Sequence, residues 1–121
     1  MMDIMQRLET MVKALDSKRA EEIKVIKIAD LTVLTEYFVI ANGTSSTQTK
    51  ALADEVEYKV KEVCGEDPAQ VQGAPGGGWV VLDYSDIIVH VFYKDQREFY
   101  NLERLWADGT EVDISGWITK E

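Results

Sequence analysis

Two acidic residues, Asp83 and Asp86, are the strongest candidates for chemistry in this 121-residue sequence. Two carboxylates at a turn could hold Mg²⁺ together with substrate phosphates, as in nucleotidyl transfer. However, residues two apart on a strand share a face, whereas these are three apart, and no Lys or Arg group stands nearby in sequence to hold a triphosphate. Hairpin-turn carboxylates or an acidic patch for a protein partner are therefore preferred, and a metal-dependent nucleotidyltransferase-like enzyme is the alternative.

His90 and Cys64, each the only residue of its type, are the other reactive candidates. His90 alternates with Ile88 and Phe92 along a predicted strand, which favours a hydrogen-bonded structural imidazole over a catalytic or metal-binding one. Cys64 falls at the C-terminal end of a predicted helix, where neither a helix N-terminus nor a nearby His activates the thiol. A single cysteine excludes an internal disulfide and a four-thiolate metal site within one chain. We predict no catalytic residue, no metal and no cofactor.

Two further segments contain features of anion-binding loops. Residues 73–78 are rich in glycine, but no Lys-Ser or Lys-Thr pair follows them and a strand is predicted next, so a flexible loop is preferred to a phosphate loop. Residues 42–46 connect a predicted strand to a helix N-terminus, where bare backbone N–H groups could receive an anion. Capping of that helix by Ser45 and Gln48 is the preferred interpretation.

Large aromatic side chains close to charged residues are typical of the buried centres of protein interfaces. Trp79, Tyr84, Tyr100 and Trp106 have this setting, and core packing is the alternative for each of them. Trp79 and Tyr84 flank a strand end and a turn, where full burial is less expected than for Phe99 on a predicted helix. Trp79 and Tyr84 are therefore the better interface candidates.

The charge balance narrows the class of partner. The chain has 22 acidic and 13 basic residues and a net charge of -9. Such a surface repels nucleic-acid phosphates and attracts basic proteins, so a protein partner is favoured and no direct nucleic-acid specificity is predicted. No run of about 18 apolar residues occurs, and the lone cysteine fits a reducing compartment, so we predict a cytoplasmic protein without membrane insertion.

The first half of the chain predicts two helices and two strands. Apolar residues recur at helical spacing near the N-terminus, at Ile4, Leu8, Met11, Val12 and Leu15. Residues 25–28 and 37–41 have strand composition. A second helix is predicted over residues 46–64, with Ser45 and Gln48 as a capping box and Gly65 as its left-handed stop. Its apolar face is supplied by Leu52, Val56, Val60 and Val63.

The second half predicts a loop, a hairpin and a third helix. Residues 68–78 have loop composition, with one short extended stretch around Val71. Residues 79–82 and 87–93 form the strands of a hairpin, and the four residues between them form its loop. Asp95 and Glu98 repeat the capping pattern, and helical spacing continues to the Asp108-Gly109 stop. The mixed spacing after Thr110 leaves the last segment unassigned.

The order of elements, α, β, β, α, loop, β, β, α, predicts an α/β domain with helices packed on a mixed sheet. The length suits one hydrophobic core rather than two. We predict one domain over residues 1–108 and a C-terminal tail over residues 109–121, in which Trp117 either self-associates or covers the core.

Three separated segments of the sequence form a distinctive set. They are Tyr-Phe-Val-Ile-Ala-Asn-Gly-Thr-Ser-Ser at 37–46, Trp-Val-Val-Leu-Asp-Tyr-Ser-Asp-Ile-Ile-Val-His-Val-Phe at 79–92 and Phe-Tyr-Asn-Leu-Glu-Arg-Leu-Trp at 99–106. Together they resemble the ribosomal silencing factor family, also called Iojap-like. The resemblance runs from Ile4 to Trp106 in unbroken order, which makes it far more specific than one short motif.

The resemblance implies a bacterial factor that binds ribosomal protein L-fourteen on the large ribosomal subunit, blocks joining of the small subunit and lowers translation when nutrients are scarce. It also implies a nucleotidyltransferase-like fold, homodimers in solution and no catalysis. A dimeric scaffold with a non-ribosomal partner is equally compatible with the composition. The segment after Asp108 departs from shorter members and has no role implied by the resemblance.

The family's contact region, carried over to this chain, lies on the predicted hairpin and third helix. The implied contact residues are Trp79, Asp83, Tyr84 and Asp86, with Arg97, Tyr100, Glu103 and Arg104 as additions. In the resulting hypothesis, Trp79 and Tyr84 fill a shallow pocket on the ribosomal protein. Asp83 and Asp86 meet its basic side chains and raise the rate of association.

Overall fold

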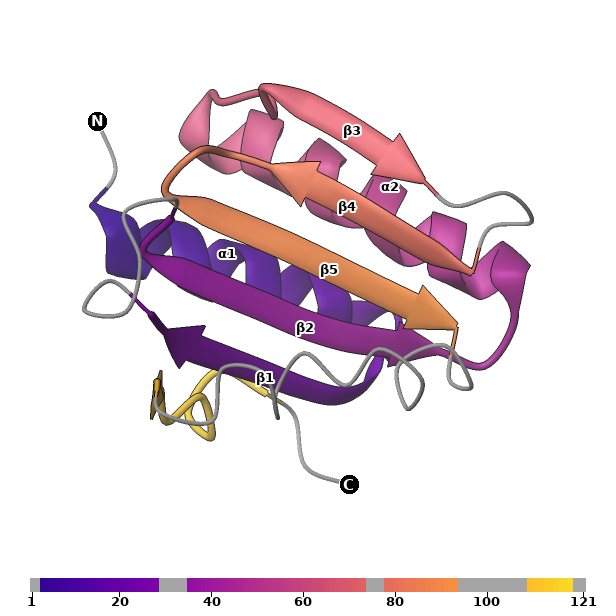
Figure 1. Cartoon of the computed structure of the whole chain (residues 1–121), viewed down its shortest axis with the longest axis horizontal. Coiled ribbons are helices and arrows are strands. Elements are labelled where there is room, and N and C mark those ends of the chain that lie inside the picture. The colour runs from indigo at the N-terminus through magenta and orange to yellow at the C-terminus, as the bar shows by residue number, and fades with distance from the viewer. Residues whose placement is uncertain (1–2, 29–34, 74–77, 94–108, 119–121) are drawn as a thin grey trace.

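A mixed six-stranded sheet carries both described helices on one of its faces (Figure 1). The structure is a computed structural model, and it describes residues 3–28, 35–73, 78–93 and 109–118. The elements are α1 (Ile4–Ser17), β1 (Glu21–Lys27), β2 (Tyr37–Gly43), α2 (Ser46–Cys64), β3 (Gln70–Gly73), β4 (Trp79–Asp83), β5 (Ile87–Tyr93) and β6 (Thr110–Glu111). The strand order is β3-β4-β5-β2-β1-β6, in which β2 and β5 are parallel and the other neighbours antiparallel. The predicted α/β class with a mixed sheet is confirmed.

The first helix begins at a capping box, because the Asp3 carboxylate accepts from the Gln6 N–H and the Gln6 side chain accepts from the Asp3 N–H. Its apolar stripe packs on the core, as predicted, in one cluster with residues of α2 and of the sheet. Four of the five predicted positions, Leu8, Met11, Val12 and Leu15, have no exposed surface. Burial of this stripe, rather than helix propensity, is what holds a 14-residue helix in place.

The second helix has the predicted bounds. Ser45 accepts from the Gln48 N–H at 3.0 Å, and Gly65 ends the helix with a φ of 70°. The Gln48 side chain accepts from the N–H of Thr44 at 2.6 Å rather than from that of Ser45, so the predicted capping box forms only in part. Val63 is 47 % exposed, and its assignment to the core face is wrong.

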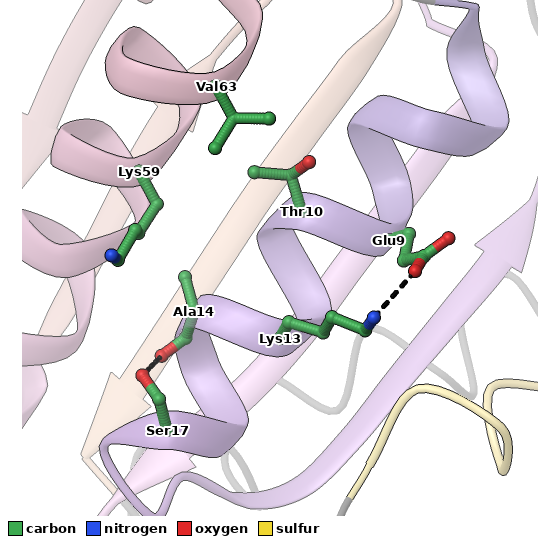
Figure 2. A pocket seen from close by; sticks show the side chains of 7 residues that line it. All are labelled: Glu9, Thr10, Lys13, Ala14, Ser17, Lys59 and Val63. Carbon is green, nitrogen blue, oxygen red and sulfur yellow. Dashed lines mark hydrogen bonds and ion pairs between the residues drawn. The ribbon is translucent and has the colours of Figure 1, made fainter.

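The exposure of Val63 has a local cause, shown in Figure 2. Val63 borders a hollow of about 330 Å³ between α1 and α2. The α1 residues across the hollow, Thr10 and Ala14, are too small to cover it (Figure 2). Two polar side chains of α1 at the hollow interact within α1 itself. Lys13 pairs with Glu9 at 2.7 Å, and the Ser17 hydroxyl donates to the Ala14 carbonyl.

The predicted strands are present with altered ends. All seven residues of β2 are buried, as befits a central strand between β5 and β1. The β1 strand begins at Glu21 rather than Val25, since a register irregularity between Glu21 and Lys24 lets the chain pair before the apolar run starts. The extended stretch around Val71 is β3, and the predicted hairpin is confirmed by the antiparallel register of β4 and β5.

The segment from Gly109 to Ile118 adds to the sheet and to the core. In β6, Glu111 pairs with Ile26 and Thr110 with Lys27 of β1. Ile114 is 9 % exposed, and Trp117 packs against the core on the helix side of the sheet. Of the two predicted roles for Trp117, covering the core is therefore the one observed. The predicted third helix, which ends at Asp108, lies outside the described residues.

Within the described ranges, no helix combines the length and apolar character needed to cross a bilayer.

Candidate protein-binding site at the hairpin

Alternation along β4 divides the predicted contact residues between the two faces of the sheet. Leu82 and Tyr84 belong to the large core under the helices, while Trp79 packs with Phe92 in the smaller cluster on the other face. Asp83, four residues after Trp79, shares its face. The structure therefore places Trp79 and Asp83 on one face, at opposite ends of β4, and separates both from Tyr84.

Trp79 is half-buried and held in a defined orientation. Its indole Nε1 donates to His90 Nδ1 at 3.2 Å. Its ring stacks on Phe92 with centroids 5.4 Å apart, and on His90 at 5.9 Å. A partly exposed aromatic ring with a fixed rotamer loses little entropy when a partner covers it, so the geometry suits an interface anchor.

His90 is the structural imidazole that the sequence predicted. It is 7 % exposed, and its ring also meets Phe38 edge-on at a centroid distance of 4.7 Å. Burial lowers the His90 pKa to about 4, so the ring is neutral at physiological pH. Since Nδ1 accepts the indole hydrogen bond, the proton lies on Nε2, which has no hydrogen-bond partner in the described part of the chain.

Tyr84 is only 4 % exposed, so the prediction that it is incompletely buried is wrong. The reason is the strand alternation, which continues past the end of β4 and turns the ring toward the helices. Its N–H donates to the Ile87 carbonyl at 2.9 Å, which fixes the backbone of the turn. Burial is the largest cause raising the Tyr84 pKa, followed by the charge of Glu57. Tyr84 supports the turn from below and does not project from it.

The turn itself is tightly tied down. The Asp83 carboxylate accepts from the N–H of Ser85 at 2.8 Å, and Ser85 has a φ of 75°. The Asp86 carbonyl accepts from the N–H groups of Glu36 at 2.9 Å and Tyr37 at 3.1 Å, at the start of β2. The partly exposed Asp83 is consequently presented on a backbone with little freedom.

Arg7 of α1 clamps the turn, and sequence reasoning missed it. Its Nη1 and Nη2 donate to the two Asp86 carboxylate oxygens at 2.6 and 2.7 Å, and its Nε donates to Glu66 at 3.1 Å. Arg7 is 8 % exposed. The hydrogen bond from Arg7 is the main cause lowering the Asp86 pKa, and the same bond raises the Arg7 pKa. A signal was present in the sequence, because Arg7 lies between Ile4 and Met11 at the spacing of the buried helix face.

The clamp changes the interpretation of Asp86. In the folded chain both oxygens of the Asp86 carboxylate already accept hydrogen bonds from the Arg7 guanidinium. The main role of Asp86 is therefore to hold the turn against α1. The guanidinium is buried and committed to carboxylates, which leaves it unsuited to a triphosphate. In the described residues no three His, Cys, Asp or Glu side chains are grouped as metal ligands, so the nucleotidyltransferase-like alternative gains no support from them.

Four predicted contact residues, Arg97, Tyr100, Glu103 and Arg104, lie outside the described residues. Cys64 has a partly buried free thiol, whose Sγ lies 3.8 Å from the Thr10 hydroxyl. The hairpin site is thus built from Trp79 and Asp83 on the face away from the helices, with Arg7 and Asp86 behind the turn.

Taken together, the strand order and the two helices define a small α/β domain with a mixed sheet and a tightly held, partly exposed hairpin. The family model described as "Ribosomal silencing factor during starvation" matches residues 2–121. The chain belongs to the ribosomal silencing factor family, and the resemblance seen in the sequence is confirmed.

Individual relatives agree with this assignment. The chain is 36 % identical over 112 residues to the ribosomal silencing factor RsfS of Halalkalibacterium halodurans, covering 93 % of this chain and 95 % of that protein. It is 31 % identical over 105 residues to mouse "Mitochondrial assembly of ribosomal large subunit protein 1", covering 83 % of this chain and 45 % of that protein. A crystal structure from Chromobacterium violaceum is similar with a TM-score of 0.83 and 34 % identity, covering 88 % of each chain.

Proposed function

We propose that this protein binds ribosomal protein L-fourteen on the large ribosomal subunit and sterically blocks joining of the small subunit. The observation that carries the proposal is the match to the ribosomal silencing factor family over residues 2–121. A relative whose name refers to assembly of the large ribosomal subunit supports the choice of subunit. The net charge of -9 suits a basic ribosomal protein better than ribosomal RNA.

The proposed contact centres on Trp79 and Asp83. Trp79 buries the exposed part of its indole in a shallow pocket of the partner, and Asp83 accepts a hydrogen bond from a basic side chain there. Val81 lies between them on the same face and is also partly exposed, so the three side chains form a continuous strip along β4. Tyr84 and Asp86 hold the turn in place beneath this strip.

Inhibition in this proposal requires no chemistry. A 13.7 kDa domain seated on the inter-subunit face occupies the volume that the small subunit needs. The fraction of silenced subunits then follows from the concentration of the protein and its affinity alone. The protein acts as a translational regulator in the cytoplasm under nutrient limitation, forms homodimers in solution and is not an enzyme. Arg97, Tyr100, Glu103 and Arg104 extend the contact beyond the described residues.

Sedimentation tests the proposal. The purified protein is mixed with large subunits, with small subunits and with both, and subunit joining is scored in the same gradients. We expect co-migration with large subunits alone and a loss of joined ribosomes. Trp79→Ala and Asp83→Ala each weaken co-migration at least about tenfold, while Val63→Ala on α2 binds like the unchanged protein. No co-migration well above micromolar concentration refutes the proposal.

A further inference from the structure

One edge of the sheet is left open for a further strand. The β3 strand (Gln70–Gly73) lies at the end of the strand order and pairs only with β4 in the part of the chain that the structure describes (Figure 1). All four of its residues are exposed, including Val71 at 52 %. A strand paired on one side has a second row of backbone N–H and C=O groups along its free edge.

The two edges of the sheet differ in how they are protected. Proteins usually blunt an edge strand with charge, proline, a bulge or extreme shortness. The opposite edge, β6, has two residues and carries Glu111. The β3 strand contains no charge and no proline, and its register with β4 is regular over four residue pairs. On an otherwise highly charged chain, this uncharged and regular edge is suited to accept another strand.

The negative charge beside β3 indicates what kind of strand can add to its free edge. Four carboxylates lie near its N-terminal end: Glu66 and Asp67 precede β3 in the chain, Asp83 pairs across from Gln70, and Asp86 shares Arg7 with Glu66. A backbone hydrogen bond brings the segment with Glu66 and Asp67 beside the hairpin turn, because the Ala69 N–H donates to the Asp83 carbonyl at 2.7 Å. The cations paired with this group are Arg7 and Lys61, so four negative charges against two positive ones leave a net charge of -2. A basic segment complements this end, and an acidic one is repelled.

We infer that the free edge of β3 receives an extended, basic segment of the ribosomal protein partner by strand addition. The inference rests on the proposed function and adds a second contact beside the β4 strip. Gln70 and Gln72 share the sheet face of Asp83 and Val81, their cross-strand partners. A Lys or Arg of the added strand, placed beside Gln70 on that face, lies close to the Asp83 carboxylate, the cross-strand neighbour of Gln70.

Hydrogen exchange measures the backbone part of the inference. Isolated large subunits are the probe, and exchange of the β3 amides is followed by mass spectrometry in the free and the bound protein. We expect amides along residues 70–73 to exchange at least about tenfold more slowly in the complex, with those of β6 unchanged. Protection of β3 that instead rises with the concentration of the free protein assigns the edge to a second copy and overturns the inference.

A pair of opposite substitutions measures the charge part. Gln72→Lys should weaken binding to large subunits about threefold to tenfold, and Gln72→Glu should strengthen it. The matched controls Val63→Lys and Val63→Glu make the same changes in net charge on α2, at another exposed position, and should have little effect. The reverse order of the Gln72 variants indicates contact with RNA phosphates and overturns the inference. If the unchanged protein binds large subunits while β3 exchange and both Gln72 variants show no effect, the inference fails alone; no binding at all refutes the proposed function instead.

Discussion

Acidification should destabilise this fold through one side chain, His90. Its pKa is about 4 in the folded protein because the ring is buried, against an ordinary value of 6.5. Between pH 6.5 and 4, His90 is therefore protonated in the unfolded chain but remains neutral in the folded chain. Stability is unaffected above the unfolded pKa, falls as the pH drops below it, and levels off below the folded pKa. The difference between a pKa of 6.5 in the unfolded chain and about 4 in the folded chain lowers the free energy of unfolding by about 3 kcal/mol at pH 4.

Urea unfolding of the unchanged protein and of His90→Gln, at pH 7, 6, 5 and 4, isolates this effect. Glutamine can still accept from the Trp79 indole but does not titrate, so the stability difference between the two proteins should shrink or reverse by about 3 kcal/mol from pH 7 to 4. Asp86 does not interfere in this window, because its pKa is lowered from 3.8 and its contribution is lost at more acidic pH. A stability difference that is constant across the range would refute the buried, neutral His90.

Three other substitutions test the supports of the hairpin and the sheet. Arg7→Leu removes the cation from Asp86, and we expect a loss of about 2 kcal/mol in urea unfolding, below the cost at a fully buried pair because the Asp86 side chain is 34 % exposed. Ser85→Gly relieves a left-handed φ of 75° and should raise stability by up to about 1 kcal/mol, measured as an increased melting temperature; a decrease contradicts the strain. Gly109→Ala places a Cβ 2.8 Å from Ile26 Cγ2, so we expect a loss of about 1–3 kcal/mol and faster amide exchange in β6; unchanged exchange contradicts the close approach.

Local signals in the sequence predicted most of the described elements. The span of α2 follows from an N-cap residue, a periodic apolar face and a glycine stop, which act within a few residues of one another. The hairpin follows from two apolar runs joined by a short polar loop. These features depend on neighbours in the chain, so one sequence is sufficient to detect them.

The candidate site was predicted less completely, because its supports join residues far apart in the chain. Arg7 and Asp86 are 79 positions apart, and no local pattern relates them. Tyr84 is buried because its side chain continues the in-and-out alternation of β4 beyond the end of that strand. The length of the turn does not reveal how far this alternation continues. Val63 fits the apolar pattern of α2 yet is exposed, because what covers a helix face is set by the neighbouring helix and not by the pattern itself.

The supports of Trp79 and Asp83 are separate, and this bears on how the proposed interface works. Trp79 is oriented by His90 and Phe92 on the sheet, whereas Asp83 is oriented by the backbone of the turn. Four residues of extended strand place them about 13 Å apart, beyond the range at which substitutions usually couple. Losses of binding free energy at the two positions should therefore add. A rigid strand with an anchor at each end fixes both the position and the direction of the domain on its partner, which is what steric exclusion of another subunit requires.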